Sequence, residues 1–232
     1  AHLKAGLVQG DGARHAGVVE IAPLGIPDAA VLDVTGRRAT TLAAHRVRGV
    51  LGQRASHAHK YDTGNVLIIA GSRGKSGAAA LAGEGALRSG AGSGTLASHA
   101  DAVGEIARRA RVELMTATAA PGALTDLLAK RGAVAIGPGL GLDETARALS
   151  HEVVLGWPGP VVVDADALSH FAGDAAKLSS AAGPRVLTPH AGELARLLSC
   201  SSRDIEADRF AAVAEAASVT GATVVLKGAH TV

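Results

Sequence analysis

Two carboxylates follow one of the most apolar stretches of the chain. Asp164 and Asp166 come directly after Val161–Val163. Because side chains alternate along an extended strand, both carboxylates could face the same way, an arrangement that suits a hydrated Mg²⁺ near phosphates. An aspartate after a strand also commonly caps the next helix. The pattern therefore leaves a metal-linked role and a capping role open.

An imidazole and a carboxylate occur together at a second position. Thr188-Pro189-His190 is followed by Glu193, three residues after the histidine. Proline is favoured at the start of a helix, and this spacing puts His190 and Glu193 on one face of the first turn. A histidine is more often an ordinary surface residue. The place of His190 at the end of a predicted strand favours a ligand role.

A lysine and a hydroxyl flank a glycine turn near the end of the sequence. Lys227 and Gly228 follow the apolar residues 224–226, and Thr231 lies three residues later. Lysine is uncommon in buried strands unless its charge is paired. Contact with a phosphate or a carboxylate is therefore expected at Lys227.

Two glycine-containing segments also follow apolar runs. Residues 71–77 resemble a P-loop, but Ile69 occupies the place of its first glycine, so the segment is not one. Its backbone N–H groups and helix start could still bind an anion, or it could be a plain turn. Gly137-Pro138-Gly139-Leu140 would let a ligand approach the backbone, although a structural turn is the commoner explanation of such a pattern.

The elements that would position these residues alternate in type. From residue 65 onward, short β-branched runs alternate with Ala/Leu-rich stretches of helical length, a pattern that predicts a mostly parallel sheet covered by helices. The runs are continuously apolar, as in strands that are buried on both faces. Strands are expected at 65–70, 94–98, 112–118, 133–136, 161–165, 185–188 and 223–227, and helices at 77–89, 102–109, 122–131, 143–149, 192–198 and 203–219. Open α/β sheets bind ligands at the carboxyl ends of their strands, where the residues above lie.

The first sixty residues differ from the rest. Residues 7–8 and 17–21 look like strand pieces, and 37–60 reads as a helix and a linker. A domain boundary is expected between residues 30 and 60.

Composition excludes several classes of protein. Of the 232 residues, 47% are hydrophobic and 19% charged, which is incompatible with long disorder. A net charge of +2 and 2% aromatic residues give no sign of nucleic-acid binding. The apolar runs are too short to span a membrane. Cys200 is the single cysteine, so a disulfide within the chain is excluded and a cytoplasmic location is expected. The remaining histidines show no metal-ligand spacing and are expected at the surface: His15, His45, His57, His59 and His151.

Taken in order, these segments resemble the ribokinase-like NAD(P)H-hydrate dehydratase family over about residues 59–232. The resemblance rests on His59-Lys60 with Gly64, Gly71-Ser72, Gly77-Ala78-Ala79, residues 86–92, Gly137-Pro138-Gly139-Leu140, Asp164-Ala165-Asp166-Ala167-Leu168, Thr188-Pro189-His190 with Glu193, and Leu226-Lys227-Gly228 with Thr231. Residues 1–30 look like the tail of the NAD(P)H-hydrate epimerase domain of bifunctional bacterial proteins, with residues 31–58 as a linker or helix. That tail is too short for epimerase function.

The resemblance implies a three-layer α/β/α fold and a lyase. Members use ADP or ATP to phosphorylate hydrated NADH or NADPH, and they release phosphate with AMP or ADP as the dihydronicotinamide is restored. By motif position, Ala78 or Ala79, Gly137, Gly139 and His190 would contact the hydrated cofactor. The nucleotide would lie against Lys227, Gly228, Ala229, His230 and Thr231, as a half-site separate from His190. Asp164 and Glu193 would hold Mg²⁺ through water.

The family's general base is an aspartate at the end of a Gly-rich loop, expected after Val232. The natural sequence is therefore expected to continue for roughly fifty to seventy residues, and the fold as given to be truncated at its C-terminus. Two alternatives remain: a small-molecule alcohol kinase of the same fold, and a catalytically inactive nucleotide-binding fragment. A homo-oligomer is expected.

Overall fold

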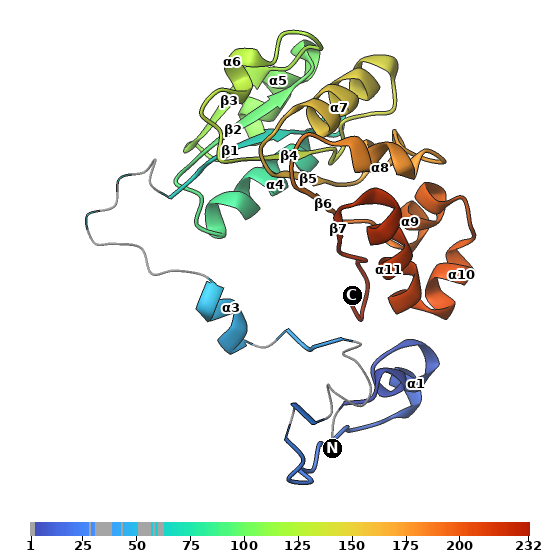
Figure 1. Ribbon diagram of the computed structural model, residues 1–232. Coiled ribbons are helices and arrows are strands. Elements are labelled where there is room, and N and C mark those ends of the chain that lie inside the picture. Colours follow the sequence, from blue (N-terminus) through green and yellow to red (C-terminus); the bar gives the residue numbers. More distant parts are fainter. Residues whose placement is uncertain are drawn as a thin grey trace. The chain divides into compact units, whose positions relative to one another are not determined.

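The computed structural model describes residues 3–27, 29–30, 39–42, 44–50, 57, 59 and 63–232 (Figure 1). It divides into two compact units, Ala1–Ala58 and His59–Val232, and each is described by itself. The second unit contains every residue that the sequence singles out for chemistry.

A seven-stranded sheet forms the centre of the second unit. Its spatial order is β3-β2-β1-β4-β5-β6-β7, and all six ladders between neighbours are parallel, as predicted. The chain builds outward from β1 through β2 to β3 and then crosses back to β4, so the strand order reverses between β1 and β4. A ligand is expected beside such a reversal, at the carboxyl ends of the strands. The strands are β1 (Asn65–Ile69), β2 (Ser93–Ser98), β3 (Leu114–Thr118), β4 (Ala133–Ile136), β5 (Val161–Val163), β6 (Arg185–Leu187) and β7 (Thr223–Val224).

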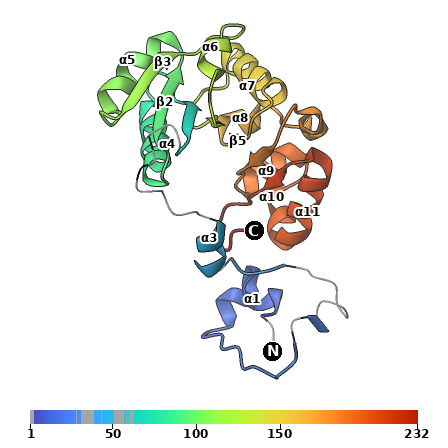
Figure 2. The same ribbon diagram turned by 60° about the vertical axis from the view of Figure 1, so that its left-hand side comes forward.

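Helices lie on both faces of this sheet, which gives three layers (Figures 1 and 2). Alternate side chains of β1 enter separate cores: Ile68 packs with α4 (Ser76–Arg88) and α5 (Ala100–Arg109), whereas Leu67 and Ile69 belong to the core of the other face. That second core takes side chains from α7 (Glu144–Gly156), α8 (Asp166–Ser169), the 3-10 helix η2 (Ala175–Ser180), α9 (Ala191–Leu198), α10 (Ser202–Ala207) and α11 (Arg209–Thr220), with α6 (Thr125–Leu128) packed against it.

Several strands depart from the expected burial on both faces, among them the edge strand β3, where Met115 is 52% exposed. In β5, Val161 and Val163 are buried, but the side chain of Val162 between them is 37% exposed. The contacts of α4 and α5 with the sheet are to β1, β2 and β3, so their cover ends before β5. The prediction was therefore wrong at Val162.

A second correction concerns the helix predicted at 203–219. The structure has two helices there, α10 and α11, with Asp208 between them at φ −144° and ψ 86°. The Asp208 carboxylate accepts a hydrogen bond from Ala211 N at 2.9 Å and so caps α11. The break makes Arg209 the first residue of α11, and this arginine is buried.

The first unit lacks the strand pieces predicted from the sequence. Leu7 lies in a 3-10 helix, η1 (Ala5–Leu7), and residues 17–21 form no strand. The described part of this unit offers no neighbouring strand for either piece, and an unpaired segment does not form a sheet. Its described part also contains α1 (Gly10–His15) and α3 (Ala44–Val50). Helix α3 falls within the helix and linker predicted at 37–60, of which residues 37–38, 43, 51–56, 58 and 60 lie outside the described residues.

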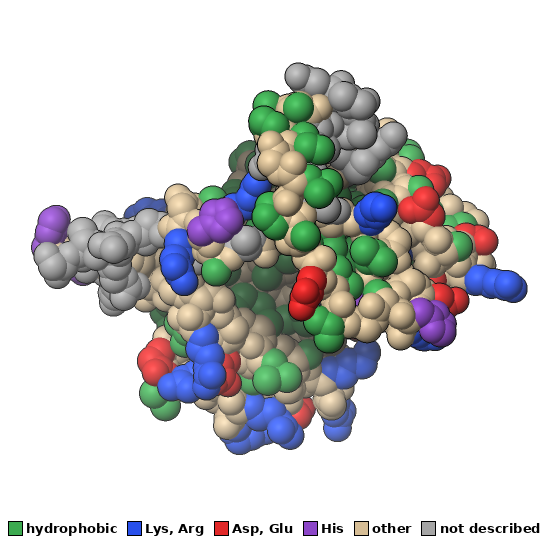
Figure 3. All heavy atoms as spheres, turned by 90° about the horizontal axis from the view of Figure 1, so that it is seen from below, with side chains coloured by type: hydrophobic (Ala, Val, Ile, Leu, Met, Phe, Trp, Pro, Cys, Tyr) green, Lys and Arg blue, Asp and Glu red, His purple; other side chains and the backbone are tan. Residues whose placement is uncertain are grey.

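Two surface features bear on partners. None of the described helices has the length and apolarity required to cross a bilayer. Basic and acidic side chains both occur on the face shown in Figure 3. The histidines expected at the surface are exposed except His151, which is half-buried because its ring packs on Phe171 at a centroid distance of 4.7 Å.

Candidate functional site

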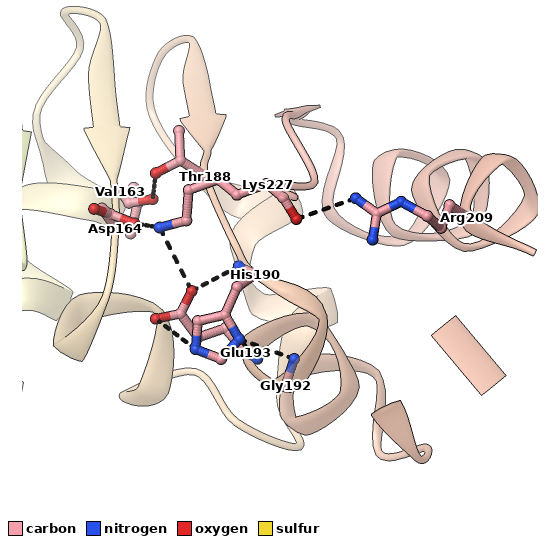
Figure 4. A network of polar contacts seen from close by, with 8 residues as sticks. All are labelled: Val163, Asp164, Thr188, His190, Gly192, Glu193, Arg209 and Lys227. Atoms are coloured by element: carbon pink, nitrogen blue, oxygen red, sulfur yellow. Dashed lines mark hydrogen bonds and ion pairs between the residues drawn. The ribbon is translucent and has the colours of Figure 1, made fainter. Parts of the chain in front are cut away.

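Lys227 lies between two carboxylates at the carboxyl edge of the sheet. Its Nζ is 2.5 Å from Asp164 Oδ1 and 3.8 Å from Glu193 Oε2 (Figure 4). The Glu193 side chain is only 9% exposed, so its charge is largely withdrawn from water and is best stabilised by a nearby cation. The structure thus joins three predicted site residues that lie on three successive strand ends.

His190 and Glu193 form a capping box at the start of α9. His190 Nδ1 accepts from Gly192 N at 3.0 Å and Glu193 N at 3.3 Å, while Glu193 Oε2 accepts from His190 N at 2.8 Å. Since Nδ1 acts as the acceptor, the ring hydrogen lies on Nε2, which is 3.5 Å from Glu193 Oε1. The predicted shared face of the first turn is present, and Glu193 links His190 to Lys227.

The main chain continues to pair beyond the assigned ends of β6 and β7. Lys227 N donates to Pro189 O at 2.8 Å, and the Lys227 carbonyl accepts from Arg209 Nη2 at 3.1 Å. Both backbone polar groups of Lys227 are therefore fixed. The sequence does not single out Arg209, because an arginine inside a predicted helix gives no sign of the helix break at Asp208 that buries it.

The four residues after Lys227 form an exposed turn. Leu226 and Val232 exchange two backbone hydrogen bonds, of 2.8 and 3.2 Å, which close the segment at its base. Thr231 Oγ1 donates to Gly228 O at 3.1 Å. Residues 228–231, which directly follow Lys227, thus present backbone and hydroxyl groups to solvent.

Asp166 belongs to a different cluster from Asp164. Its Oδ2 accepts from Gly141 N at 2.8 Å and pairs with Lys75 Nζ at 3.4 Å. Neither aspartate caps α8 through its side chain. Between them Ala165 has φ 48° and ψ −120°, which an L residue rarely adopts. The two carboxylates therefore serve separate partners instead of one shared ligand.

The Gly137–Gly141 loop packs closely on its neighbours. Gly139 has φ 64°, and a Cβ there would lie 3.0 Å from Ala78 Cβ and 3.2 Å from Lys75 O. A Cβ on Gly137 would lie 1.9 Å from Asp164 O. Close packing therefore requires glycine at both positions, whether or not a ligand binds there. Ala78 is half-buried, whereas the Ala79 side chain is fully buried in the core and is not available to a ligand.

The 71–77 segment is a turn held by a residue that sequence analysis missed. Glu105 on α5 accepts from Ser76 Oγ at 2.6 Å and from Gly74 N at 3.3 Å. These two bonds, the Ser76 bond first, lower the pKa of the Glu105 carboxyl. Ser72 Oγ donates to Gly139 O at 2.8 Å and ties this turn to the glycine loop. No local pattern pairs Glu105 with a turn that lies 29 residues before it.

A cavity of about 580 Å³ lies at the ends of β1 and β2, beside the start of α7. None of the predicted cofactor-binding residues lines it. Asp143, in its wall, caps α7 by accepting from Ala146 N at 2.9 Å. The wall carries a positive charge on Arg73 and negative charges on Asp101, Asp143 and Glu144, and its other lining residues are Ser72, His99 and Thr145.

No group of three or more His, Cys, Asp or Glu side chains within the described residues could hold a metal ion. Asp164 and Glu193, the residues predicted to hold Mg²⁺, instead share the ammonium of Lys227. Their predicted metal role stays a prediction.

The chain resembles known enzymes along most of its length. A bifunctional NAD(P)H-hydrate repair enzyme (Nnr) from Moorella thermoacetica is 39% identical, and the match covers 99% of this chain but 45% of that protein. The chain thus spans less than half the length of this relative.

Solved structures agree on the fold. An ADP/ATP-dependent NAD(P)H-hydrate dehydratase from Bacillus subtilis, co-crystallised with ATP/Mg²⁺, has a TM-score of 0.67 and 30% identity, over 81% of this chain and 66% of that one. A ribokinase-like superfamily protein from Enterococcus faecalis also has a TM-score of 0.67, with 27% identity over 82% of this chain and 66% of that one. The three-layer fold is therefore ribokinase-like.

The family model for NAD(P)H-hydrate dehydratase matches residues 66–232, the stretch that carries all of the sheet except Asn65 and both carboxylate clusters. On this match, the chain belongs to the NAD(P)H-hydrate dehydratase family.

Proposed function

We propose that this protein dehydrates hydrated NADH or NADPH at the expense of ADP or ATP, at the carboxyl edge of its sheet. The observation that carries the proposal is the cluster of Lys227, Asp164 and Glu193 beside the exposed 228–231 turn. In a member of this family, the half-exposed Lys227 ammonium suits the phosphates of a nucleotide, because an ammonium is a compact positive charge with three hydrogen-bond donors.

Lys227 would act on the nucleotide phosphates as a point charge. Its ammonium would exchange part of its pairing with Asp164 for a phosphate oxygen, while its fixed backbone keeps the side chain in reach. Gly228, Ala229, His230 and Thr231 would contact the nucleotide through backbone groups and the Thr231 hydroxyl.

Asp164 and Glu193 fit a magnesium ion by their chemistry. Both present carboxylate oxygens, the ligands that Mg²⁺ prefers, and both reach one cation, the Lys227 ammonium. Two carboxylates with waters and phosphate oxygens make an ordinary magnesium shell, so these two residues would hold the ion. Bound Mg²⁺ would neutralise charge on the transferred phosphoryl group.

The hydrated nicotinamide would lie on the small-residue side of the same edge. Ala78 and Gly139 lie close together there, after β1 and β4. His190 follows β6 at the same edge of the sheet, and its ring is partly exposed. Gly137 and the main chain of Ala79 would shape the floor. This surface orients the ring and excludes water, so that the ring hydroxyl faces the terminal phosphoryl group.

The reaction would proceed in two steps. The ring hydroxyl oxygen bonds to the terminal phosphorus of the nucleotide, the bond to the nucleotide breaks, and the hydroxyl proton passes to a base. The ring nitrogen lone pair then expels the phosphate with its oxygen, and loss of a proton from the neighbouring carbon restores the dihydronicotinamide.

Three further expectations stay as proposals: an epimerase-like tail in residues 1–30 with a linker over 31–58, a homo-oligomer, and a cytoplasmic location. The match to a bifunctional relative over 99% of the chain supports the first.

The test is stoichiometry. With hydrated NADH, ADP or ATP and Mg²⁺, the protein should restore the dihydronicotinamide absorbance and release one phosphate per turnover. A stable phosphorylated alcohol with hydrated NADH untouched would mean a kinase of the same fold. Nucleotide binding without turnover would mean a binding module.

A further inference from the structure

Arg209 is a buried cation behind the Lys227 turn. It is 4% exposed, and its Nη2 donates to Leu226 O at 3.0 Å and to Lys227 O at 3.1 Å. Its Nη1 pairs with Glu206 Oε1 at 2.8 Å. One guanidinium thus holds two successive carbonyls through Nη2 and a carboxylate through Nη1, a planar fork that an ammonium does not reproduce.

The main chain of Lys227 is held from two sides. Pro189 O accepts from its N–H at 2.8 Å, and Arg209 donates to its C=O. Figure 4 shows Arg209 and Asp164 on opposite sides of Lys227, one at its carbonyl and the other at its ammonium. Because the backbone cannot shift, the reach of the ammonium is set by side-chain torsions alone.

Burial of this arginine has a cost that packing does not explain. Its Nε is buried with no hydrogen-bond partner among the described residues. A buried donor left unpaired costs about 1–3 kcal/mol, and an apolar side chain would avoid that cost. The guanidinium therefore has a role that an apolar residue cannot take.

Gly228 fits the guanidinium closely. A Cβ at this position would lie 2.9 Å from Arg209 Nη2 and 3.4 Å from Cζ. A side chain at residue 228 would therefore displace the group that holds the Leu226 and Lys227 carbonyls.

We propose that Arg209 is a positioning residue for the nucleotide half of the site: it sets nucleotide affinity by fixing the Lys227–Gly228 backbone, without touching the nucleotide. The inference rests on the proposed function, since it takes the nucleotide as the ligand of Lys227.

The chain offers a matched control. Arg185 is also 4% exposed, and it donates to the carbonyls of Val154 at 2.6 Å and Gly159 at 2.9 Å. It begins β6 and so lies at the opposite, amino edge of the sheet. Arg185→Lys should disturb a buried arginine of the same kind without reaching the nucleotide turn.

The experiment measures ADP affinity by calorimetry, with Mg²⁺ present, together with melting temperature. Arg209→Lys should weaken ADP binding about ten-fold, because a misplaced Lys227 ammonium would lose much of a hydrogen bond to a charged group, and about 1.4 kcal/mol corresponds to a factor of ten. Arg185→Lys should change the ADP affinity less than about two-fold, even if its melting temperature falls as much as that of Arg209→Lys. In a protein that already carries Lys227→Met, adding Arg209→Lys should weaken ADP binding by less than about two-fold relative to Lys227→Met alone.

Gly228→Ala gives a second route should Arg209→Lys fail to fold, and it too should weaken ADP binding while the arginine remains. The inference would be overturned if the folded Arg209→Lys protein bound ADP as tightly as wild type. If Arg209→Lys does not fold, unchanged ADP affinity in Gly228→Ala would overturn it. An equal loss in Arg185→Lys, or a full ten-fold loss in the Lys227→Met background, would do the same. Wild-type protein that binds neither ADP nor ATP would overturn the proposed function, and this inference with it.

Discussion

Asp164 and Asp166 are separated by one residue, yet they serve clusters of different construction. Asp164 meets Lys227 at 2.5 Å in a cluster of charges that includes the nearly buried Glu193. Asp166 meets Lys75 at 3.4 Å and otherwise binds a backbone N–H of the glycine loop.

Under the proposed function, this difference divides the two ligands between the clusters. The Lys227 cluster holds its components by charge, so it suits phosphates and Mg²⁺. The Lys75 cluster lies against glycines that let the backbone approach Ala78 closely, so it suits an uncharged ring held by shape. Substitutions in the two clusters test this division.

Lys227→Met should weaken ADP binding about thirty-fold, because a hydrogen bond to a charged group contributes about 2 kcal/mol. Calorimetry with ADP measures it. Lys75→Met is the matched control, since Lys75 is exposed and belongs to the other cluster; it should change ADP affinity less than about three-fold. Equal losses in the two variants would abolish the division.

Gly139→Ala should destabilise the fold by about 1–3 kcal/mol, because φ is 64° there and the new Cβ would press on Ala78 and Lys75. Thermal or denaturant unfolding measures the loss. Binding of hydrated NADH should fall while ADP affinity stays within about two-fold. Gly85→Ala, in α4 with open space around it, should instead stabilise the fold by about 0.5–1 kcal/mol. A Gly139→Ala protein as stable as wild type would contradict the structure of the loop.

Ala165→Gly should stabilise the fold by up to about 1 kcal/mol, since glycine relieves the strain at φ 48° but adds chain entropy in the unfolded state. Denaturant unfolding tests this. Ala214→Gly in the exposed part of α11 should cost about 1 kcal/mol. If both substitutions destabilise the fold equally, the backbone at Ala165, between the two aspartates, is not strained.

The smallest effect expected is one of pH. Because Ser76 and Gly74 lower the pKa of Glu105, this carboxylate stabilises the folded state above its ordinary pKa of 4.5, and that contribution is lost as pH falls through the lowered value. Glu105→Gln should flatten the dependence of melting temperature on pH below 4.5. An unchanged slope would show that the bonds from Ser76 and Gly74 do not form in solution.

Much of the architecture could be predicted from the sequence. Apolar runs such as residues 65–70 are local signals, and so is the position of Asp164, His190 and Lys227 just after such runs. The order of strands is not local. The sequence predicts His190 and Lys227 as separate half-sites, whereas the adjacency of β6 and β7 joins them through Pro189 and Glu193.

The features that sequence reasoning missed depend on single backbone angles or distant contacts. The divergence of Asp164 and Asp166 follows from Ala165, a residue type that gives no hint of positive φ. Arg209 reaches the interior because the chain breaks at Asp208, inside a stretch whose composition reads as one helix. Glu105 binds a turn from another element.

The central claim is that the ring hydroxyl is phosphorylated before it leaves. Hydrated NADH labelled with oxygen-18 at that hydroxyl, incubated with ADP and Mg²⁺, tests this directly by mass spectrometry of the released phosphate. The account predicts one labelled oxygen in each phosphate, because the bond broken in the second step lies between ring carbon and oxygen. Unlabelled phosphate, with the label recovered in water while the dihydronicotinamide forms, would contradict it.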